Sequence, residues 1–345
     1  MRALTVQRLL LRCGILAAIL FVVVVIALKL GAVPVSLYGL ARDLISVMLG
    51  HRSAISSDYG LIVIDIRLPR ILLGIVVGAS LSIAGTSFQA LLRNPLADPY
   101  VLGVSGGAAV GAIAATLIAP HLSLAPTFVT LLTPFGAFLG AAGTIAAVYF
   151  LGQRHGEIDN GTLLLAGIIS GSFFSAIIMF LLTTQSSSLH GMSYWLMGDL
   201  SVSPPRSLYA MLIGGFFLAA GAIYTTASDL NLLLSGEKEA MHLGVDVRRV
   251  RIVVYICASI LTGLAVSVSG SIGYVGLLVP HVMRLIFGSD HRTLLPTAAI
   301  GGAIAVVIAD TLARVVVAPA ELPVGAMTAL AGAPLFLYLL RKNLA

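Results

Sequence analysis

Long apolar runs separated by short polar segments are the dominant pattern of this chain. The first run ends at Leu28, follows several arginines, and has about the ~20 residues that a helix needs to cross a bilayer. No small-residue cleavage motif follows it, so we expect a retained spanning helix and not a removed signal peptide. We expect nine further spans, at residues 71–92, 100–119, 127–152, 162–184, 207–227, 250–269, 275–288, 296–317 and 323–341.

The charges between the runs predict the orientation of the chain. Ten spans put both termini on one side of the membrane, and thirteen of the twenty lysines and arginines fall on that side, against seven opposite. Because loops rich in Lys and Arg stay in the cytoplasm, we expect both termini to be cytoplasmic. Residues 29–66 would then form an external loop, with a short interfacial helix at about 36–49.

Composition supports one polytopic membrane domain over residues 1–345. Hydrophobic residues make up 59% of the chain, charged residues 10%, and the mean hydropathy is +1.05, which leaves too little polar surface to cover a soluble globule. Thirty-six glycines and 7% aromatic residues favour closely packed helices over a β-barrel, so we expect an all-α fold. Gly103, Gly106 and Gly107 lie inside an apolar span and indicate such packing rather than a dinucleotide-binding loop.

The sequence excludes several kinds of chemistry. The three lysines (Lys29, Lys238 and Lys342) follow no phosphate-cradling glycine loop, and no histidine pair has metal-binding spacing. No paired acids and no nucleophile with a base appear, so we expect no cofactor, no metal and no enzymatic activity. The net charge of +6 comes from basic residues at the ends of apolar runs, which argues against nucleic acid. Cys13 and Cys257 lie in apolar runs and are expected to be packing residues.

A short sequence similarity between the two halves of the chain suggests an inverted repeat. Gly85 stands ten residues before Pro95, and Gly270 stands ten residues before Pro280. These pairs follow the second and seventh predicted spans, and an offset of five spans would give the two halves opposite orientations, as in transporters with inverted repeats. A chance match in a glycine-rich chain remains the alternative.

Three arginines are expected at the external ends of spans. Arg67 and Arg70 lie three residues apart, on one helical face, with Pro69 marking the helix start. They either anchor the helix by snorkelling to the interface or receive carboxylates from a partner protein. Arg314 would join them from the ninth span, but it stands four residues after Asp310, so an ion pair within the helix is the competing role.

Two cytoplasmic turns could close a pathway. In the turn at residues 93–99 (RNPLADP), Pro95 and Pro99 prevent helix continuation and Asn94 favours a reversal. The turn is either a tight helix connection or, together with the Asp-Asn-Gly turn at residues 159–161, a constriction at the inner end of a pathway.

The longest cytoplasmic segment, residues 235–251, predicts a short helix. Ser235 can cap it, two glutamates favour its N-terminal end, Ala240 and Leu243 give it a small apolar face, and Gly244 can end it. A short amphipathic helix here suits docking into a groove on another protein, and a solvated loop is the alternative.

Six motifs together resemble the FecCD-type permeases, the membrane subunits of ABC importers for iron-siderophores, haem and cobalamin. The resemblance extends from about Arg67 to Leu340 and rests on RLPR, RNPLADPYVLGVSGGAAVG, YWLMGDLS, GEKEAMHLGV, GLLVPHVMRLIFGSDHR and ELPVGAMTALAGAPLF. It implies a homodimer in the bacterial inner membrane, with two copies of a separate cytoplasmic ATPase below it and one periplasmic substrate-binding protein above it. The chelate is not implied, because specificity in this family resides largely in the binding protein.

The resemblance also assigns roles to residues. Arg67, Arg70 and Arg314 would dock the binding protein, and the cytoplasmic gate would comprise Asn94, Pro95, Leu96, Asn160 and Gly161. The coupling helix in the ATPase groove would comprise Glu237, Lys238, Glu239, Ala240, Met241, His242, Leu243 and Gly244. The second gating turn reads Asp-Asn-Gly-Thr where the family is often hydroxyl-rich, which leaves its individual gate residues open.

The main alternative is a secondary transporter driven by an ion gradient. Such a protein usually needs an ionisable residue in mid-membrane, and Asp310 is the best candidate. Its neighbour Arg314 would keep the carboxylate ionised and poorly suited to proton exchange.

Overall fold

The computed structural model describes residues 6–31, 62–122, 125–154, 157–184, 192–201 and 204–344. The external loop expected at residues 29–66, with its short helix, lies mostly outside these residues. The principal helices are α1 (Val6–Lys29), α4 (Leu68–Leu91), α5 (Val104–Ile118), α6 (Pro126–Leu151), α7 (Asn160–Thr184), α9 (Arg206–Thr225), α12 (Val247–Ser269), α13 (Val275–Phe287), α14 (His291–Val315) and α15 (Val324–Leu344).

Shorter elements connect these helices. They are the π-helical turn η2 (Ile62–Arg67), the 3₁₀ turns η3 (Pro99–Leu102) and η4 (Ala119–His121), the helices α8 (Met192–Leu196), α10 (Ala227–Leu233) and α11 (Glu237–His242), and the paired strands β1 (Gln153–Arg154) and β2 (Glu157–Ile158). The expected all-α fold is confirmed, because this two-residue ladder is the sole sheet in the described residues.

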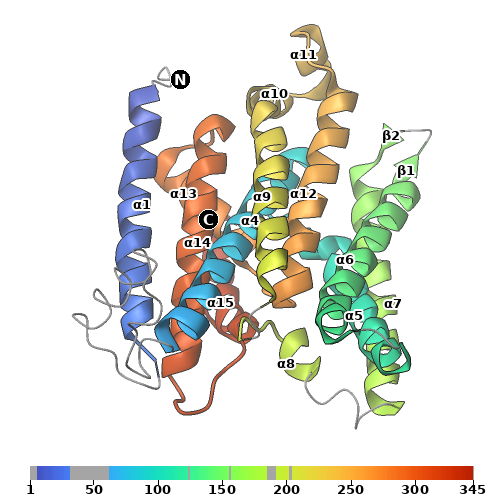
Figure 1. The fold of residues 1–345 in the computed structure, drawn as a ribbon. Helices are drawn as coiled ribbons and strands as arrows, with labels where there is room; N and C mark the ends of the chain where they lie inside the picture. The colour runs from blue at the N-terminus through green and yellow to red at the C-terminus, as the bar shows by residue number, and fades with distance from the viewer. Residues whose placement is uncertain are drawn as a thin grey trace.

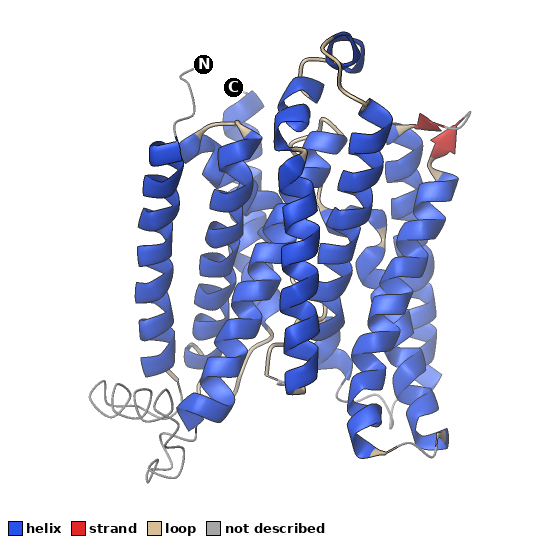
Figure 2. Cartoon of the chain, turned by 45° about the horizontal axis from the view of Figure 1, so that its top comes forward, coloured by secondary structure: helices blue, strands red, loops and turns tan. Residues whose placement is uncertain are grey.

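The helices form one bundle, with α11 projecting beyond one end of it (Figure 1). Helix α1 begins and α15 ends at that same end (Figure 2), as an even number of spans requires. Among the described residues, eight helices are long and apolar enough to cross a membrane, whereas α13 and the apolar part of α15 are shorter. The 13 residues of α13 extend only about 20 Å, less than the ~30 Å hydrocarbon core. The count of ten spans and the cytoplasmic termini stay predictions.

Helix α4 runs obliquely through the middle of the bundle and packs against α12, α13 and α14 (Figure 1). In its most apolar stretch 83% of the residues are buried, compared with 6% in α1 and 11% in α7. Pro69 is the second residue of α4, so it marks the start of this α-helix as expected, and the π-helical turn from Ile62 precedes it.

Small residues let the helix backbones approach closely. A Cβ atom at Gly78 of α4 would collide with the carbonyl of Gly302 in α14, and one at Gly107 of α5 would collide with Thr144 of α6. The interpretation of the glycines as packing residues is therefore confirmed at Gly107, the third glycine of the expected group.

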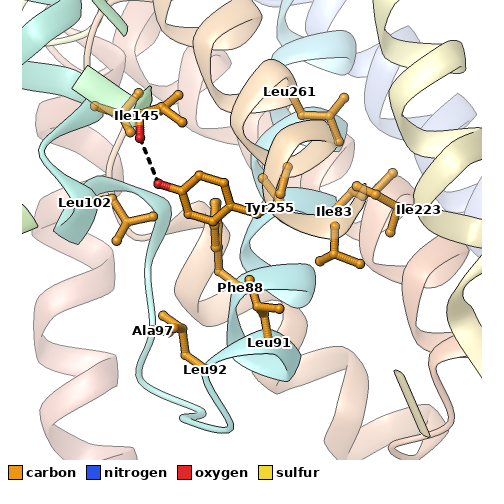
Figure 3. Close-up of a cluster of buried hydrophobic side chains, with 14 of the residues drawn as sticks. Ile83, Phe88, Leu91, Leu92, Ala97, Leu102, Ile145, Ile223, Tyr255 and Leu261 are labelled. Carbon is orange, nitrogen blue, oxygen red and sulfur yellow. Dashed lines mark hydrogen bonds between the residues drawn. The ribbon is translucent and has the colours of Figure 1, made fainter. Parts of the chain in front are cut away.

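Aromatic and aliphatic side chains fill the core between α4, α6 and α12 (Figure 3). The rings of Phe88 and Tyr255 meet edge to face, with centroids 5.9 Å apart. The Tyr255 hydroxyl donates a hydrogen bond of 3.0 Å to the carbonyl of Ile145, so its buried polar atom is satisfied. This contact joins α12 to α6.

Candidate functional site

The end of the bundle at which α4 begins holds a compact cluster of charges. Arg70 Nε donates to Asp310 Oδ1 at 2.7 Å, and Arg70 Nη1 donates to Glu321 Oε2 at 2.7 Å. Arg314 Nε lies 3.1 Å from Asp310 Oδ2, which confirms the ion pair expected within that helix. Asp310 therefore bridges two guanidinium groups from two different helices, and α4 is fixed to α14 by charge as well as by packing.

Arg67 belongs to the same end of the bundle. Its Nη1 donates to the carbonyl of Leu28 at 2.8 Å, so it satisfies the backbone at the end of α1. Arg67, Arg70 and Arg314 are only 5%, 4% and 5% exposed. This burial agrees neither with snorkelling to the lipid interface nor with an open patch of cations, both of which would leave the guanidinium groups accessible.

Glu321 is the exposed member of this charge cluster. Its side chain is 46% exposed, against 2% for that of Asp310. Sequence reasoning missed Glu321, although it begins the ELPVG motif after α14, because a lone acidic residue in a loop has no spacing that identifies its partner. The docking role of the three arginines stays a prediction, and any partner would meet Glu321 first.

At the opposite end of the bundle, the turn after α4 has a defined conformation. Arg93 adopts a left-handed backbone conformation, with φ of 49°. The Asn94 side chain accepts from the backbone N–H of Leu96 at 2.9 Å, so the asparagine stabilises the reversal that its position predicted. Leu96 is 45% exposed and available for movement or contact.

Asp98 ends this turn and caps the helical turn η3. Its Oδ1 accepts from the backbone N–H of Tyr100 at 2.8 Å. Burial raises the pKa of the Asp98 carboxyl to about 6, because removal from water disfavours the charged form, while the hydrogen bond from Tyr100 opposes the rise.

The second turn of the expected gate lies against the first. Asp159 accepts from the backbone N–H and the hydroxyl of Thr162, at 2.8 and 2.6 Å, and so caps α7. Asn160 Nδ2 donates a long hydrogen bond of 3.4 Å to the carbonyl of Leu92, at the end of α4. The structure thus brings together two turns separated by more than sixty residues. Their role as a gate remains a prediction.

Helix α11 is a short helix exposed at this end. Gly236 precedes it with φ of 134°, and Gly244 follows it with φ of 87°, so the stop at Gly244 is as expected. The expected cap at Ser235 is wrong, because the N-cap position is Gly236. Ala240 is fully buried, whereas Leu243 is 65% exposed, so only part of the expected apolar face packs inside this chain.

Glu237 links α11 to two other elements. Its Oε1 accepts hydrogen bonds from Arg93, in the turn after α4, and from Arg251 in α12. The sequence did not predict this link, since Arg93 and Glu237 are 144 residues apart. Glu237 therefore joins α11 to the turn that carries Asn94.

A second buried contact outside the sequence expectations ties α4 to α13. Arg284 Nη2 donates to Gln89 Oε1 at 2.9 Å, and Gln89 Nε2 donates to the carbonyl of Leu277 at 3.3 Å. Within the described ranges, no group of three or more His, Cys, Asp or Glu side chains is arranged to hold a metal ion.

Comparison with known proteins gives a consistent result over most of the chain. The model of the FecCD transport family matches residues 19–342. The chain is 43% identical over 282 residues to the cobalamin import system permease protein of Halobacterium salinarum, covering 82% of this chain and 74% of that protein. It is 42% identical over 283 residues to the hemin transport system permease protein of Yersinia pestis, covering 81% and 83%.

A solved structure agrees with this result. The fold matches an inward-facing conformation of a metal-chelate type ABC transporter with a TM-score of 0.78 and 30% sequence identity. The match covers 96% of this chain and 98% of that one.

Proposed function

The chain belongs to the FecCD transport family, and on that premise we propose that it is the transmembrane permease subunit of an ATP-binding-cassette importer. The cargo class is an iron chelate (a siderophore complex or haem) or cobalamin, which enters the cytoplasm of a bacterium through its inner membrane. The names of the relatives support this class, and the nearly uncharged spans suit a bulky cargo that needs a wide path and no tight site.

The exposed helix α11 is the observation that carries the proposal. Met241 and Leu243 are 54% and 65% exposed on a helix that projects beyond the bundle, and exposed apolar side chains on such a helix suit a groove on a partner. The partner is the cytoplasmic ATPase. Because Glu237 joins α11 to Arg93, closure of the ATPases would move the turn at Asn94, which supports the assignment of that turn as a gate.

The assembly that we propose contains two copies of this chain, two ATPases and one binding protein. Ile168 and Phe173 on α7 are 55% and 63% exposed, and a second copy would cover such a helix if the path runs between two subunits. The permease itself is a single transmembrane domain that carries no ATPase chemistry.

The binding protein is proposed to dock at the external charge cluster. Among its described members, the cations Arg67, Arg70 and Arg314 outnumber the carboxylates Asp310 and Glu321. Glu321 is half exposed and bonded to Arg70, so a carboxylate of the binding protein can take the place of Glu321 at Arg70. The buried arginines would bind the partner through this exchange of carboxylates.

The test removes the exposed apolar face of α11 and keeps the helix. Met241→Ser with Leu243→Ser should release the ATPase from the purified complex and abolish uptake into vesicles. Arg249→Ser, at an exposed polar position just outside α11, is the matched control and should retain both. A double variant that still binds the ATPase and supports full uptake would contradict the proposal.

The energy source separates this proposal from the gradient-driven alternative. The Asp310 carboxylate is paired with two fixed cations, Arg70 and Arg314, so it is not free to bind and release a coupling ion. Uptake should stop when ATP is depleted and persist when ionophores collapse the ion gradients. The reverse result would favour the secondary transporter.

A further inference from the structure

A groove with a volume of about 340 Å³ lies between α6 and α12. Its α6 wall extends from Phe138 to Phe150, and its α12 wall extends from Ile252 to Gly263. At 1.5 Å per residue the walls are about 16–18 Å long, which is close to half of the ~30 Å hydrocarbon core. The groove thus matches one leaflet of a bilayer in length.

The base of this groove is fixed and its walls are apolar. Tyr255 and Ile145, joined by the hydrogen bond of 3.0 Å, both line it (Figure 3). Ala142 and Ala146 contribute small, exposed side chains one helical turn apart on α6, which leaves the groove open along its length.

The groove opens at one end into a charged basin of about 760 Å³, with which it shares Tyr149 and Ile252. Four cations line the basin against two carboxylates, namely Arg93, Lys238, Arg248 and Arg251 against Glu237 and Glu239. Glu237 is already bonded to Arg93 and Arg251. Lys238 and Arg248 are exposed, and no ion pair engages either of them within the described part of the chain.

We propose that this groove and basin together bind one anionic phospholipid from the leaflet on the α11 side. One acyl chain lies in the groove between α6 and α12, and the phosphate headgroup lies against Arg248 and Lys238. A groove between two membrane-spanning helices is within reach of lipid and out of reach of a soluble partner, and basic pockets at the cytoplasmic ends of helices attract anionic headgroups. The length of the groove and the net positive charge of its mouth match this occupant.

The site lies beside the moving parts of the proposed transporter. The headgroup would contact the basin that Glu237 and α11 line, so a bound lipid would stiffen the connection between α11 and α12. The lipid proposal requires only that the chain spans a membrane, and its test measures no transport. Its failure would leave the importer proposal intact.

The experiment compares two lipids on the purified full chain in mild detergent. Phosphatidylglycerol or phosphatidylcholine with identical acyl chains is added, and bound lipid is counted by native mass spectrometry. We expect phosphatidylglycerol to be retained preferentially. Arg248→Gln should lower that preference about fivefold, the factor that corresponds to ~1 kcal/mol for one cation near an anionic surface. Arg249 is exposed and lies outside the basin, so Arg249→Gln is the matched control and should leave the preference for phosphatidylglycerol unchanged.

The groove itself is tested by filling it. Ala146→Phe should abolish the bound lipid, whereas Ala147→Phe, exposed on α6 but outside the groove, should retain it. Ala142→Phe, one turn along, replaces the first variant if that one does not fold. Equal binding of the two lipids, or equal effects at positions 146 and 147, would overturn the proposal. Loss of the dimer with bound lipid unchanged would also overturn it and assign the groove to a second copy of the chain.

Discussion

Asp310 is the residue on which the charge cluster at the start of α4 depends. It is 1% exposed and bonded to Arg70 and close to Arg314, so Asp310→Asn would leave two buried guanidinium groups without their shared carboxylate. We expect a loss of about 3–5 kcal/mol in the free energy of unfolding, seen as a lower thermal midpoint in detergent. Glu321→Gln is the control, because a half-exposed pair contributes at most ~1 kcal/mol. Equal midpoints for the two variants would contradict this assignment.

Glu321 also allows the docking proposal to be tested without disturbing the buried cluster. If Glu321 occupies the position that a carboxylate of the binding protein takes, the two carboxylates compete for Arg70. Glu321→Gln should then weaken the bond of residue 321 to Arg70 and strengthen capture of the binding protein. The measurement is the affinity of the loaded binding protein for the purified complex. Weaker or unchanged capture would show that Glu321 does not compete for Arg70.

Asp98 predicts a pH dependence of stability. Since its pKa is raised from 3.8 to about 6 in the folded chain, the folded state prefers the protonated carboxyl. Its contribution to stability is thus fully present below about pH 3.8 and is lost as the pH rises through about 6. Asp98→Asn keeps an acceptor for Tyr100 and removes the charge, so the thermal midpoint of this variant should change less between pH 4 and 7 than that of the wild type. An unchanged pH profile would contradict the burial of this carboxyl.

At the scale of single residues, the sequence predicted contacts within one helix better than contacts between helices. The spacing of Asp310 and Arg314 predicted their ion pair, because four residues is one helical turn. The burial of Arg67 and Arg70 could not be predicted, since it depends on α1 and α14, which are distant in the sequence. The link from Glu237 to Arg93 is hidden for the same reason.

At the scale of helices, packing through glycine predicts a contrast within α6. A Cβ atom at Gly140 would collide with the carbonyl of Gly107 in α5, whereas one at Gly143 meets nothing within 4 Å. Gly140→Ala should therefore lower the free energy of unfolding by about 1–3 kcal/mol, through forced separation of the two helices. Gly143→Ala should be neutral or slightly stabilising, because alanine favours helix. Thermal midpoints in detergent provide the comparison, and similar midpoints would argue against this helix contact.

Most helices could be predicted because apolar runs of span length leave few alternatives in a membrane protein. The run at residues 71–92 corresponds to α4, and the run at 127–152 corresponds to α6. Boundaries failed where proline was read as a limit, since Pro296 lies inside α14, which begins five residues earlier. Pro296 is the sixth residue of α14, beyond the four N–H groups that lack acceptors in any helix, so the carbonyl of Arg292 loses its helical donor. The Tyr224 hydroxyl donates to that carbonyl at 3.3 Å instead.

At the scale of the whole molecule, α4 connects the two ends of the described bundle. The charge cluster of Arg70 and Asp310 lies where α4 begins, and the turn held by Arg93 and Glu237 lies at its other end. Since α4 is the most buried of the candidate spans, we expect it to be the rigid element through which a change at α11 would reach the charge cluster. The described bundle is thus built around one connecting helix.

This arrangement predicts that ATP hydrolysis and uptake can be separated. Glu237→Gln weakens the links to Arg93 and Arg251 but keeps the exposed apolar face of α11, so the ATPase should still bind and hydrolyse ATP. Uptake into vesicles should fall, because movement of α11 is no longer transmitted to the turn after α4. Glu239→Gln, an exposed acid on the same helix, should retain coupled uptake. If both variants take up cargo at the same rate per ATP hydrolysed, the coupling does not pass through Glu237 and must travel through the packing of Ala240 alone.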